Sequence, residues 1–206
     1  MVQSAFTSVT DVPSSKDSAS FPSAISPRPH LARKLVALTG FMGCGKSTVA
    51  RLLAKQIGWI HSDLDKRIVE RAGLTVPEIF SRHGEASFRE MEHEELKRIL
   101  GEAREFSKST IVSLGGGTVV QDRNLELLRQ TGCPVVWLYC NVEELLRRCS
   151  HITNRPLFRD EVSFRQLYAQ RVPFYEQADF RVESSVEPLR VVQQIIDLKI
   201  LEGVPA

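Results

Sequence analysis

Short apolar runs along the chain alternate with stretches that have helical periodicity. The apolar runs predict strands at residues 35–38, 59–63, 110–114, 134–140 and 181–182. Helical spacing of apolar residues predicts helices at residues 47–57, 76–106 (broken near Gly84) and 187–201. In the last helix we expect a core face formed by Leu189, Val192, Ile195, Ile196 and Ile200. Because strands alternate with helices, the pattern predicts an α/β fold, with a mainly parallel sheet covered by helices on both faces.

The first thirty residues have a different composition, with eight serines and four prolines. Such a segment buries too little apolar surface to offset its ordering entropy, so we expect residues 1–30 to be a disordered extension and residues 31–206 to form one domain. A plastid transit peptide is the alternative, since transit peptides are rich in serine. They are also poor in acidic residues, and Asp11 and Asp17 argue against this alternative.

Overall composition is that of a globular protein. Of the 206 residues, 42% are hydrophobic and 25% are charged, and the net charge of +2 does not indicate nucleic-acid binding. No stretch approaches the length of a membrane-spanning helix, so we expect no membrane partner. The cysteines form no CxxC pair, which argues against a zinc site or a disulfide framework and favours the cytoplasm; they are Cys44, Cys133, Cys140 and Cys149.

Residues 40–47, GFMGCGKS, match the pattern G-x-x-x-x-G-K-[ST] between a predicted strand and a predicted helix. In such a phosphate-binding loop (P-loop), backbone N–H groups and the helix N-terminus surround the phosphates of a nucleotide. Lys46 would reach the β- and γ-phosphates, and the Ser47 hydroxyl could hold Mg²⁺. A glycine-rich turn with a purely structural role is the alternative. No N-K-x-D guanine signature is present, which argues against a GTPase.

Two carboxylates, Asp63 and Asp65, follow the second predicted strand. Ligands bind at the carboxyl ends of strands in open α/β sheets, so one carboxylate could serve Mg²⁺ and the other could accept the proton of a substrate hydroxyl. The alternative is helix capping, in which Ser62 or Asp63 caps a helix that begins near Leu64.

Arginines and glycines supply further candidates. Arg89 precedes Glu92 by three residues, and an exposed ion pair would explain these two taken alone. Gly115, Gly116 and Gly117 end a buried strand and would leave bare backbone facing the ligand. Residues 150–161 lie between two predicted helices in an arginine-rich region, which is typical of a mobile lid over phosphates or of a solvated basic surface.

Taken together, these motifs resemble the shikimate kinase family. The resemblance runs through residues 34–200 and rests on residues 40–48, 63–65, 88–92, 115–117, 155–157 and 171–175. It implies the three-layer α/β/α fold of P-loop NTPases, with a five-stranded parallel sheet in the order 2-3-1-4-5. The implied activity is transfer of the ATP γ-phosphate to the 3-hydroxyl of shikimate, in the biosynthesis of chorismate and the aromatic amino acids. It also implies a monomer.

The resemblance assigns a role to each candidate residue. The catalytic residues would be Lys46, Asp65 and Arg155. ATP would be bound by Gly43, Cys44, Gly45, Lys46, Ser47, Thr48, Arg148 and Arg155. Shikimate would be bound by Asp65, Arg89, Gly115, Gly116, Gly117 and Arg171, with the two arginines on its carboxylate. The Mg²⁺ ion would be held by Ser47 and Asp63. A gluconate kinase of the same architecture and a nucleotide-binding protein without catalysis are the alternatives to this function.

Overall fold

The structure is a computed structural model that describes residues 35–150 and 160–201. Residues 151–159, which contain Arg155 and most of the predicted lid, lie outside the described residues, as do residues 1–34 and the predicted boundary at residue 31. The strands are β1 (Leu35–Thr39), β2 (Ile60–Asp63), β3 (Thr110–Ser113), β4 (Val135–Tyr139) and β5 (Phe180–Glu183). The helices are α1 (Lys46–Ile57), α2 (Leu64–Ala72), α3 (Val76–Glu105), α4 (Asp122–Gln130), α5 (Val142–Cys149), α6 (Glu161–Tyr175) and α7 (Pro188–Asp197), with a short 3-10 turn, η1 (Thr118–Val120).

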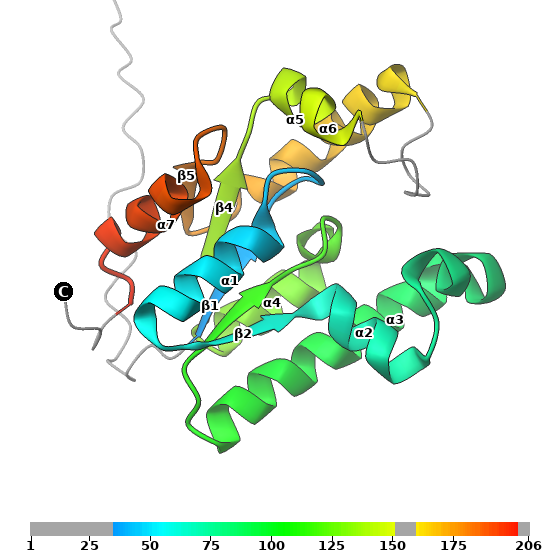
Figure 1. The fold of residues 1–206 in the computed structure, drawn as a ribbon. Helices are drawn as coiled ribbons and strands as arrows, with labels where there is room; N and C mark the ends of the chain where they lie inside the picture. Colours follow the sequence, from blue (N-terminus) through cyan, green and yellow to red (C-terminus); the bar gives the residue numbers. More distant parts are fainter. Residues whose placement is uncertain (1–34, 151–159, 202–206) are drawn as a thin grey trace, which may run out of the picture. The chain divides into compact units, whose positions relative to one another are not determined.

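The five strands form one parallel sheet in the order β2-β3-β1-β4-β5, which confirms the predicted topology (Figure 1). Strand β1 lies at its centre, and Val36, Ala37 and Leu38 are fully buried. Ser113 is in register with Leu38 of β1 and with Asp63 of β2. The carboxyl ends of β1, β2 and β3 therefore meet at one edge of the sheet, where ligands bind in this class of fold.

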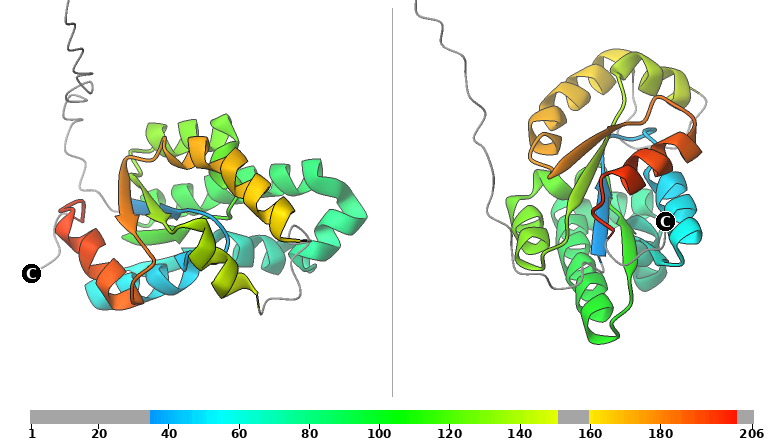
Figure 2. Two further views of the ribbon diagram at one scale, coloured as in Figure 1. Left: turned by 90° about the horizontal axis from the view of Figure 1, so that it is seen from above. Right: turned by 90° about the vertical axis from the view of Figure 1, so that its left-hand side faces the viewer.

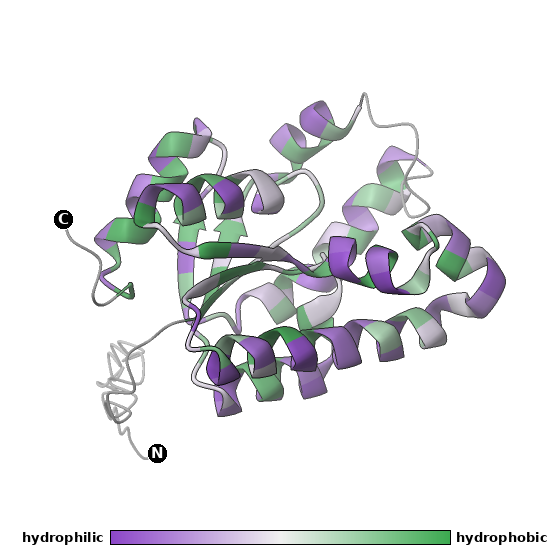
Figure 3. Cartoon of the chain, turned by 60° about the horizontal axis from the view of Figure 1, so that its bottom comes forward, coloured by the Kyte–Doolittle hydropathy of each residue, from purple (hydrophilic) through white to green (hydrophobic). Residues whose placement is uncertain are grey.

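Helices cover both faces of the sheet, as the alternating pattern predicts. Helices α1 and α7 lie on one face, while α3, α4 and α6 lie on the other (Figure 2). Hydrophobic and hydrophilic residues alternate along the helices on both faces of the sheet (Figure 3). In α1 the buried positions are Val49, Ala50, Leu53 and Ala54, which follow the helical period. No helix in the described part of the chain combines the length and the apolar character needed to cross a membrane.

Helix α3 breaks where the sequence predicts. Gly84 has φ 79° and ψ 169°, a non-helical conformation in the left-handed half of the map that favours glycine. The segment of α3 before the break starts with a capping box, in which Thr75 and Glu78 exchange hydrogen bonds. Because of this break, the helical segment after Gly84, which carries Arg89, can have a different direction from the segment before it.

The predicted last helix is too long. Helix α7 ends at Asp197, and Lys199 has a φ of 53°, so the chain has left the helix before Ile200. Ile200 is nevertheless buried, whereas Leu189 in the first turn is 54% exposed. The prediction that Leu189 is a core residue is wrong, because Leu189 lies on the side of the first turn of α7 that does not face the sheet. Helix α4 has no counterpart among the predicted helices; it is amphipathic and buries Leu125 and Leu128.

Candidate active site

The loop between β1 and α1 adopts a conformation that depends on its glycines. Gly43 and Gly45 have φ values of 83° and 95°, which residues with a side chain rarely adopt. A methyl group on Gly43 would also lie 2.6 Å from the sulfur of Cys149. Nζ of Lys46, at the start of α1, donates to the carbonyl oxygens of Gly40 (2.9 Å) and Phe41 (3.1 Å). The loop thus presents its backbone and one ammonium group at the N-terminus of α1, as phosphate binding requires.

Cys44 and Phe41 point into the protein from this loop. Cys44 is 1% exposed, and its sulfur lies 4.0 Å from Nζ of Lys46. The ring of Phe41 packs edge-on against Phe164 (5.0 Å) and Tyr168 (5.3 Å), both on α6. Cys44 therefore helps the loop pack, and any contact that it makes with a nucleotide would come from its backbone.

Asp63 at the end of β2 caps α2 and also faces the P-loop. Its carboxylate accepts from the backbone N–H of Lys66 (3.1 Å), which is the capping alternative, and from the hydroxyls of Ser47 (2.6 Å) and Ser113 (2.8 Å). Burial raises the pKa of Asp63, but the hydrogen bonds from Ser47, Lys66 and Ser113 outweigh burial, so the pKa lies below its usual value. Capping and ligand binding are compatible here, because the second carboxylate oxygen faces Ser47.

A charged carboxylate and a hydroxyl 2.6 Å apart suit a hard divalent cation. Magnesium prefers oxygen ligands and keeps several waters, so a few protein oxygens together with phosphates are enough. Among the described residues, no group of three or more His, Cys, Asp or Glu side chains is arranged to hold a metal by itself. The residues present therefore fit a magnesium ion that arrives with a nucleotide.

Each of the three glycines after β3 lies against a different candidate side chain. A methyl group on Gly115 would lie 2.8 Å from Oδ1 of Asp65, and one on Gly117 would lie 2.8 Å from both Nη atoms of Arg89. On Gly116 it would lie 3.3 Å from Nη1 of Arg171. None of the three has a positive φ. The glycines are needed for space, because any side chain would displace a charged group that faces the site.

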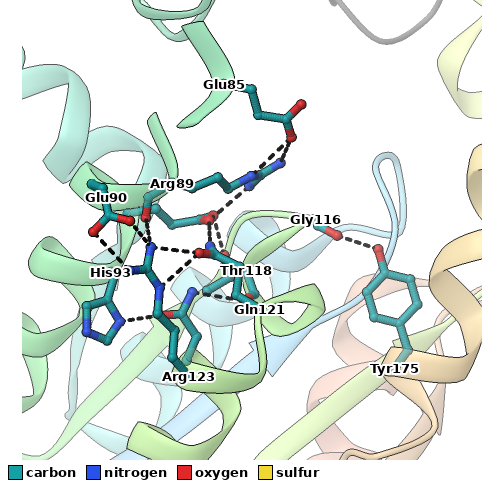
Figure 4. Close-up of polar contacts among 11 residues, drawn as sticks. Glu85, Arg89, Glu90, His93, Gly116, Thr118, Gln121, Arg123 and Tyr175 are labelled. Carbon is teal, nitrogen blue, oxygen red and sulfur yellow. Dashed lines mark hydrogen bonds and ion pairs between the residues drawn. The ribbon is translucent and has the colours of Figure 1, made fainter. Parts of the chain in front are cut away.

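Arg89 is held from two sides by carboxylates (Figure 4). Its Nη1 donates to Glu92 (2.9 Å), which is completely buried, and Nη2 donates to the exposed Glu85 (3.0 Å). Glu92 also accepts from the hydroxyl of Thr118 (2.6 Å) and from Nε2 of Gln121 (2.8 Å). Burial lowers the pKa of Arg89, but the charge of Glu92 and the hydrogen bonds to Glu92 and Glu85 together outweigh burial, so the pKa is raised and the guanidinium stays charged. The simple exposed ion pair is therefore the wrong interpretation for Arg89 and Glu92.

A second set of contacts fixes the turn that carries Thr118. Nδ1 of His93 lies 2.7 Å from Oδ1 of Asn124, and Nδ2 of Asn124 donates to the carbonyl oxygen of Thr118 (Figure 4). Arg123 bridges the exposed Glu90 (2.7 Å) and the backbone oxygen of Arg89. These bonds join α3 to η1 and α4, and they explain why the support for Arg89 extends beyond its own helix.

Arg171 comes from α6 and lies beside Gly116, whereas Arg89 lies beside Gly117. It is only 8% exposed, and its guanidinium lies 5.7 Å from the centre of the Phe41 ring. A buried cation needs a partner. Its position beside Gly116 leaves it able to pair with an anionic ligand in the cavity.

A cavity of about 490 Å³ brings most of the predicted site residues together. Its lining includes Gly43, Gly45, Lys46, Ser47, Thr48, Asp63, Asp65, Arg89, Gly115, Gly116, Gly117 and Arg171. Glu92, Phe88 and Phe80 also line the cavity. The cavity lining thus combines three basic side chains, Lys46, Arg89 and Arg171, with the glycines of the P-loop and of the triplet after β3.

Other predicted arginines lie elsewhere. Arg148 on α5 donates to Glu144 (2.7 Å) and lies 3.5 Å from the carbonyl oxygen of Gly43, so it lies beside the P-loop but not in the cavity lining. Arg147 and Arg165 are exposed and pair with Glu144 and Glu143. For these two, the solvated surface is the correct interpretation. Arg155 lies in the segment outside the described residues.

Comparison with known proteins identifies the family of this chain. The family model for shikimate kinase matches residues 42–199. The chain belongs to the shikimate kinase family. The shikimate kinase of Geobacter metallireducens is 44% identical over 153 residues, which are 73% of this chain and 82% of that protein. The shikimate kinase of Synechococcus elongatus is 37% identical over 166 residues, 78% of this chain and 84% of that protein.

Solved structures agree with this family. The shikimate kinase of Acinetobacter baumannii, determined in complex with shikimate, has a TM-score of 0.74 and 33% identity, and the match covers 82% of this chain and 94% of that one. A gluconokinase from Sinorhizobium meliloti shares only the fold, with a TM-score of 0.51 and 18% identity over 79% of this chain and 89% of that one. Shikimate kinases are ATP-dependent kinases, so the expected enzyme class is confirmed.

Sequence reasoning missed several supporting residues. Thr118 and Gln121 hold Glu92, and Tyr175 donates to the backbone oxygen of Gly116. Thr118 follows the glycine triplet directly and Tyr175 lies four residues after Arg171, one turn of helix away. Their short distance in the sequence from a candidate residue is therefore the only hint that these residues belong to the site. This hint does not reveal which partner each side chain binds.

Proposed function

We propose that this member of the shikimate kinase family transfers the γ-phosphoryl group of ATP to the 3-hydroxyl of shikimate, giving shikimate 3-phosphate and ADP. The observation that carries the proposal is the single cavity that joins the P-loop, with Lys46, to Asp65, Arg89 and Arg171. A P-loop alone serves many kinases and ATPases. Two arginines and a carboxylate within reach of it select a substrate that has both a carboxylate and a hydroxyl.

Arg89 and Arg171 would bind the carboxylate of shikimate, with the backbone of the glycine triplet between them. Guanidinium groups suit a planar carboxylate because they donate two parallel hydrogen bonds. Both arginines are largely shielded from water, which strengthens their attraction for an anion. A sugar without the acid group would leave these charges without that partner.

Asp65 would accept the proton of the 3-hydroxyl. The hydroxyl oxygen then bonds to the γ-phosphorus, while the bond from that phosphorus to the β–γ bridging oxygen breaks and ADP leaves with the electron pair. Lys46 would stabilise charge on the β- and γ-phosphates, and Gly43, Gly45 and Thr48 would bind the phosphates from the loop. Catalysis in this class comes mainly from positioning and charge stabilisation.

Ser47 and Asp63 would hold Mg²⁺, because their oxygens lie 2.6 Å apart at the edge of the cavity. When bound, the ion would neutralise phosphate charge. Arg148 would contact the nucleotide from α5, and Cys44 would contribute its backbone. Arg155 would close onto the phosphates from residues 150–161. A monomer, a cytoplasmic location and a disordered extension at residues 1–30 remain predictions.

Release of ADP, measured with ATP and Mg²⁺ in a coupled assay, tests the proposal. The assay would compare shikimate, gluconate and no acceptor. Turnover with shikimate alone is the expected result. Turnover with gluconate in place of shikimate would indicate a gluconate kinase. ATP binding without turnover on either acid would favour a non-catalytic role.

A further inference from the structure

Tyr175, the last residue of α6, makes a contact that packing alone does not require. The residue is completely buried, and its hydroxyl donates a hydrogen bond of 2.5 Å to the carbonyl oxygen of Gly116 (Figure 4). Its ring lies against Trp137 of β4, with the ring centres 5.9 Å apart. Burial raises the pKa of Tyr175, so the hydroxyl keeps its proton and remains a donor.

Gly116 lies where Arg171 and the start of the P-loop come close together. A methyl group on it would lie 3.3 Å from Nη1 of Arg171, 3.6 Å from the carbonyl oxygen of Gly40 and 3.8 Å from the backbone nitrogen of Met42. Gly116 therefore lies close to both the buried arginine and the start of the P-loop. A small rotation of this backbone would change the distance between the carboxylate end and the phosphate end of the cavity.

The hydrogen bond from Tyr175 restricts that rotation. A peptide unit is planar and trans, so the carbonyl of Gly116 and the N–H of Gly117 point in opposite directions. Holding the oxygen towards α6 turns that N–H away from α6, towards the side where Arg89 lies against Gly117. Glycines have no side chain to fix their backbone, so an outside partner has a large effect on them.

Tyr175 is also linked to Arg171, from which it is one turn away on α6. The positive charge of Arg171 is close enough to lower the pKa of the Tyr175 hydroxyl, although burial is the larger effect and raises it. The same side chain thus binds the glycine backbone and lies near the guanidinium, and a substrate carboxylate would bind between these two groups. If α6 shifts, Arg171 and Gly116 shift together.

We propose that Tyr175 is a positioning residue that holds Gly116 and Arg171 in the geometry that binds the substrate carboxylate. This role rests on the proposed function, since it concerns the carboxylate of shikimate. Tyr175 does not line the cavity and would touch neither substrate nor nucleotide. Its effect is on substrate affinity and not on the chemistry of phosphoryl transfer.

Tyr168 provides a matched control on the same helix. Its hydroxyl also donates to a backbone oxygen, that of Cys140 (3.1 Å), but this bond lies at the end of β4 and involves none of the three glycines. Tyr175→Phe and Tyr168→Phe each remove one hydroxyl and keep the ring. A general loss of packing or stability in α6 would appear in both variants.

Steady-state kinetics of the full chain with shikimate and with its methyl ester test the proposal. Loss of one hydrogen bond gives a free-energy change that corresponds to roughly a 3- to 10-fold rise in KM for shikimate in Tyr175→Phe. We expect kcat and the KM for ATP to stay near wild type, and the KM for the ester to change much less, because its acid group is masked. Tyr168→Phe should change none of these values.

Amide chemical shifts of the glycines give an independent reading. In nitrogen-15 spectra, Tyr175→Phe should move the signals of Gly116 and Gly117, and Tyr168→Phe should not. An unchanged KM for shikimate in Tyr175→Phe, or equal changes for shikimate and its ester, would overturn the positioning role while the activity stands. Wild-type protein without shikimate-dependent turnover would refute the proposed function itself.

Discussion

Arg89 donates from Nη1 to Oε2 of Glu92 over 2.9 Å, and Glu92 is completely buried beneath it. The same guanidinium reaches Glu85 at 3.0 Å, but the side chain of Glu85 is 62% exposed. One arginine therefore has one buried and one exposed carboxylate partner. The buried pair sets the position of the guanidinium, because an exposed pair is screened by water.

Replacing the two glutamates separates these contributions. Glu92→Gln removes the negative charge and places an amide donor against Gln121, so we expect a loss of about 1–3 kcal/mol in the free energy of unfolding. The KM for shikimate should rise, because Arg89 loses its fixed orientation. Glu85→Gln, the control at the other end of the same guanidinium, should change both values little. Urea unfolding and steady-state kinetics measure them, and equal effects of the two substitutions would contradict the account.

Gly117→Ala tests whether the glycine triplet is needed for space. The methyl group would lie 2.8 Å from both Nη atoms of Arg89, so the guanidinium must move and the KM for shikimate should rise by about tenfold or more, the effect of losing one charge-assisted hydrogen bond. Backbone strain is not involved, because φ of Gly117 is −111°.

Gly101→Ala is the matched control for that substitution. A methyl group on Gly101, in the exposed part of α3, meets no atom within 4 Å. This change should stabilise the helix by about 0.5–1 kcal/mol and leave the kinetics unchanged. If Gly117→Ala has wild-type affinity for shikimate, the close approach of Arg89 to the glycine backbone has no role in binding.

Asp65→Asn removes the proposed proton acceptor and keeps the shape of the side chain. We expect kcat to fall by at least about 100-fold and the KM for shikimate to rise as well, because Asp65 would also bind the substrate hydroxyl. The melting temperature should change little, since Asp65 is exposed in the first turn of α2. Asp122→Asn is the control, because Asp122 is an exposed acid in the first turn of α4 and does not line the cavity. Wild-type kcat in Asp65→Asn would exclude this residue as the base.

Ser47→Ala removes one of the two oxygens proposed for Mg²⁺. The Mg²⁺ concentration needed for half-maximal rate should rise, because Asp63 alone would remain as a protein ligand, and the KM for shikimate should stay the same. Ser81→Ala, which removes an exposed hydroxyl on α3, is the control. An unchanged Mg²⁺ requirement in titrations of the Ser47 variant would show that this hydroxyl does not bind the metal.

Much of the fold could be predicted because its signals are local. Buried parallel strands are continuous apolar runs, and β1, β3 and β4 stand out as such in the sequence. The end of α7 could not be placed, because Ile200 continues the helical spacing although the chain turns at Lys199. Exposure of Leu189 depends on which side of that helix meets the sheet, and this is a property of the assembled protein.

The candidate site could be predicted where a motif fixes the residue type, as in the P-loop and the glycine triplet. The burial of Glu92 could not, because its partners Thr118 and Gln121 are more than twenty residues away in the chain. Tyr175 lies further still from Gly116, at a separation of 59 residues. Such contacts follow from how α3 and α6 pack around η1, and no single stretch of sequence contains them.

The most direct test of the central claim is the identity of the product. Phosphorus–proton correlation NMR of a reaction with ATP, Mg²⁺ and shikimate reports which carbon bears the new phosphate. We predict a correlation from the new phosphorus signal to the proton on C3 of shikimate. A phosphate on another carbon, or inorganic phosphate alone, would contradict the arrangement of Asp65, Arg89 and Arg171 proposed for this cavity.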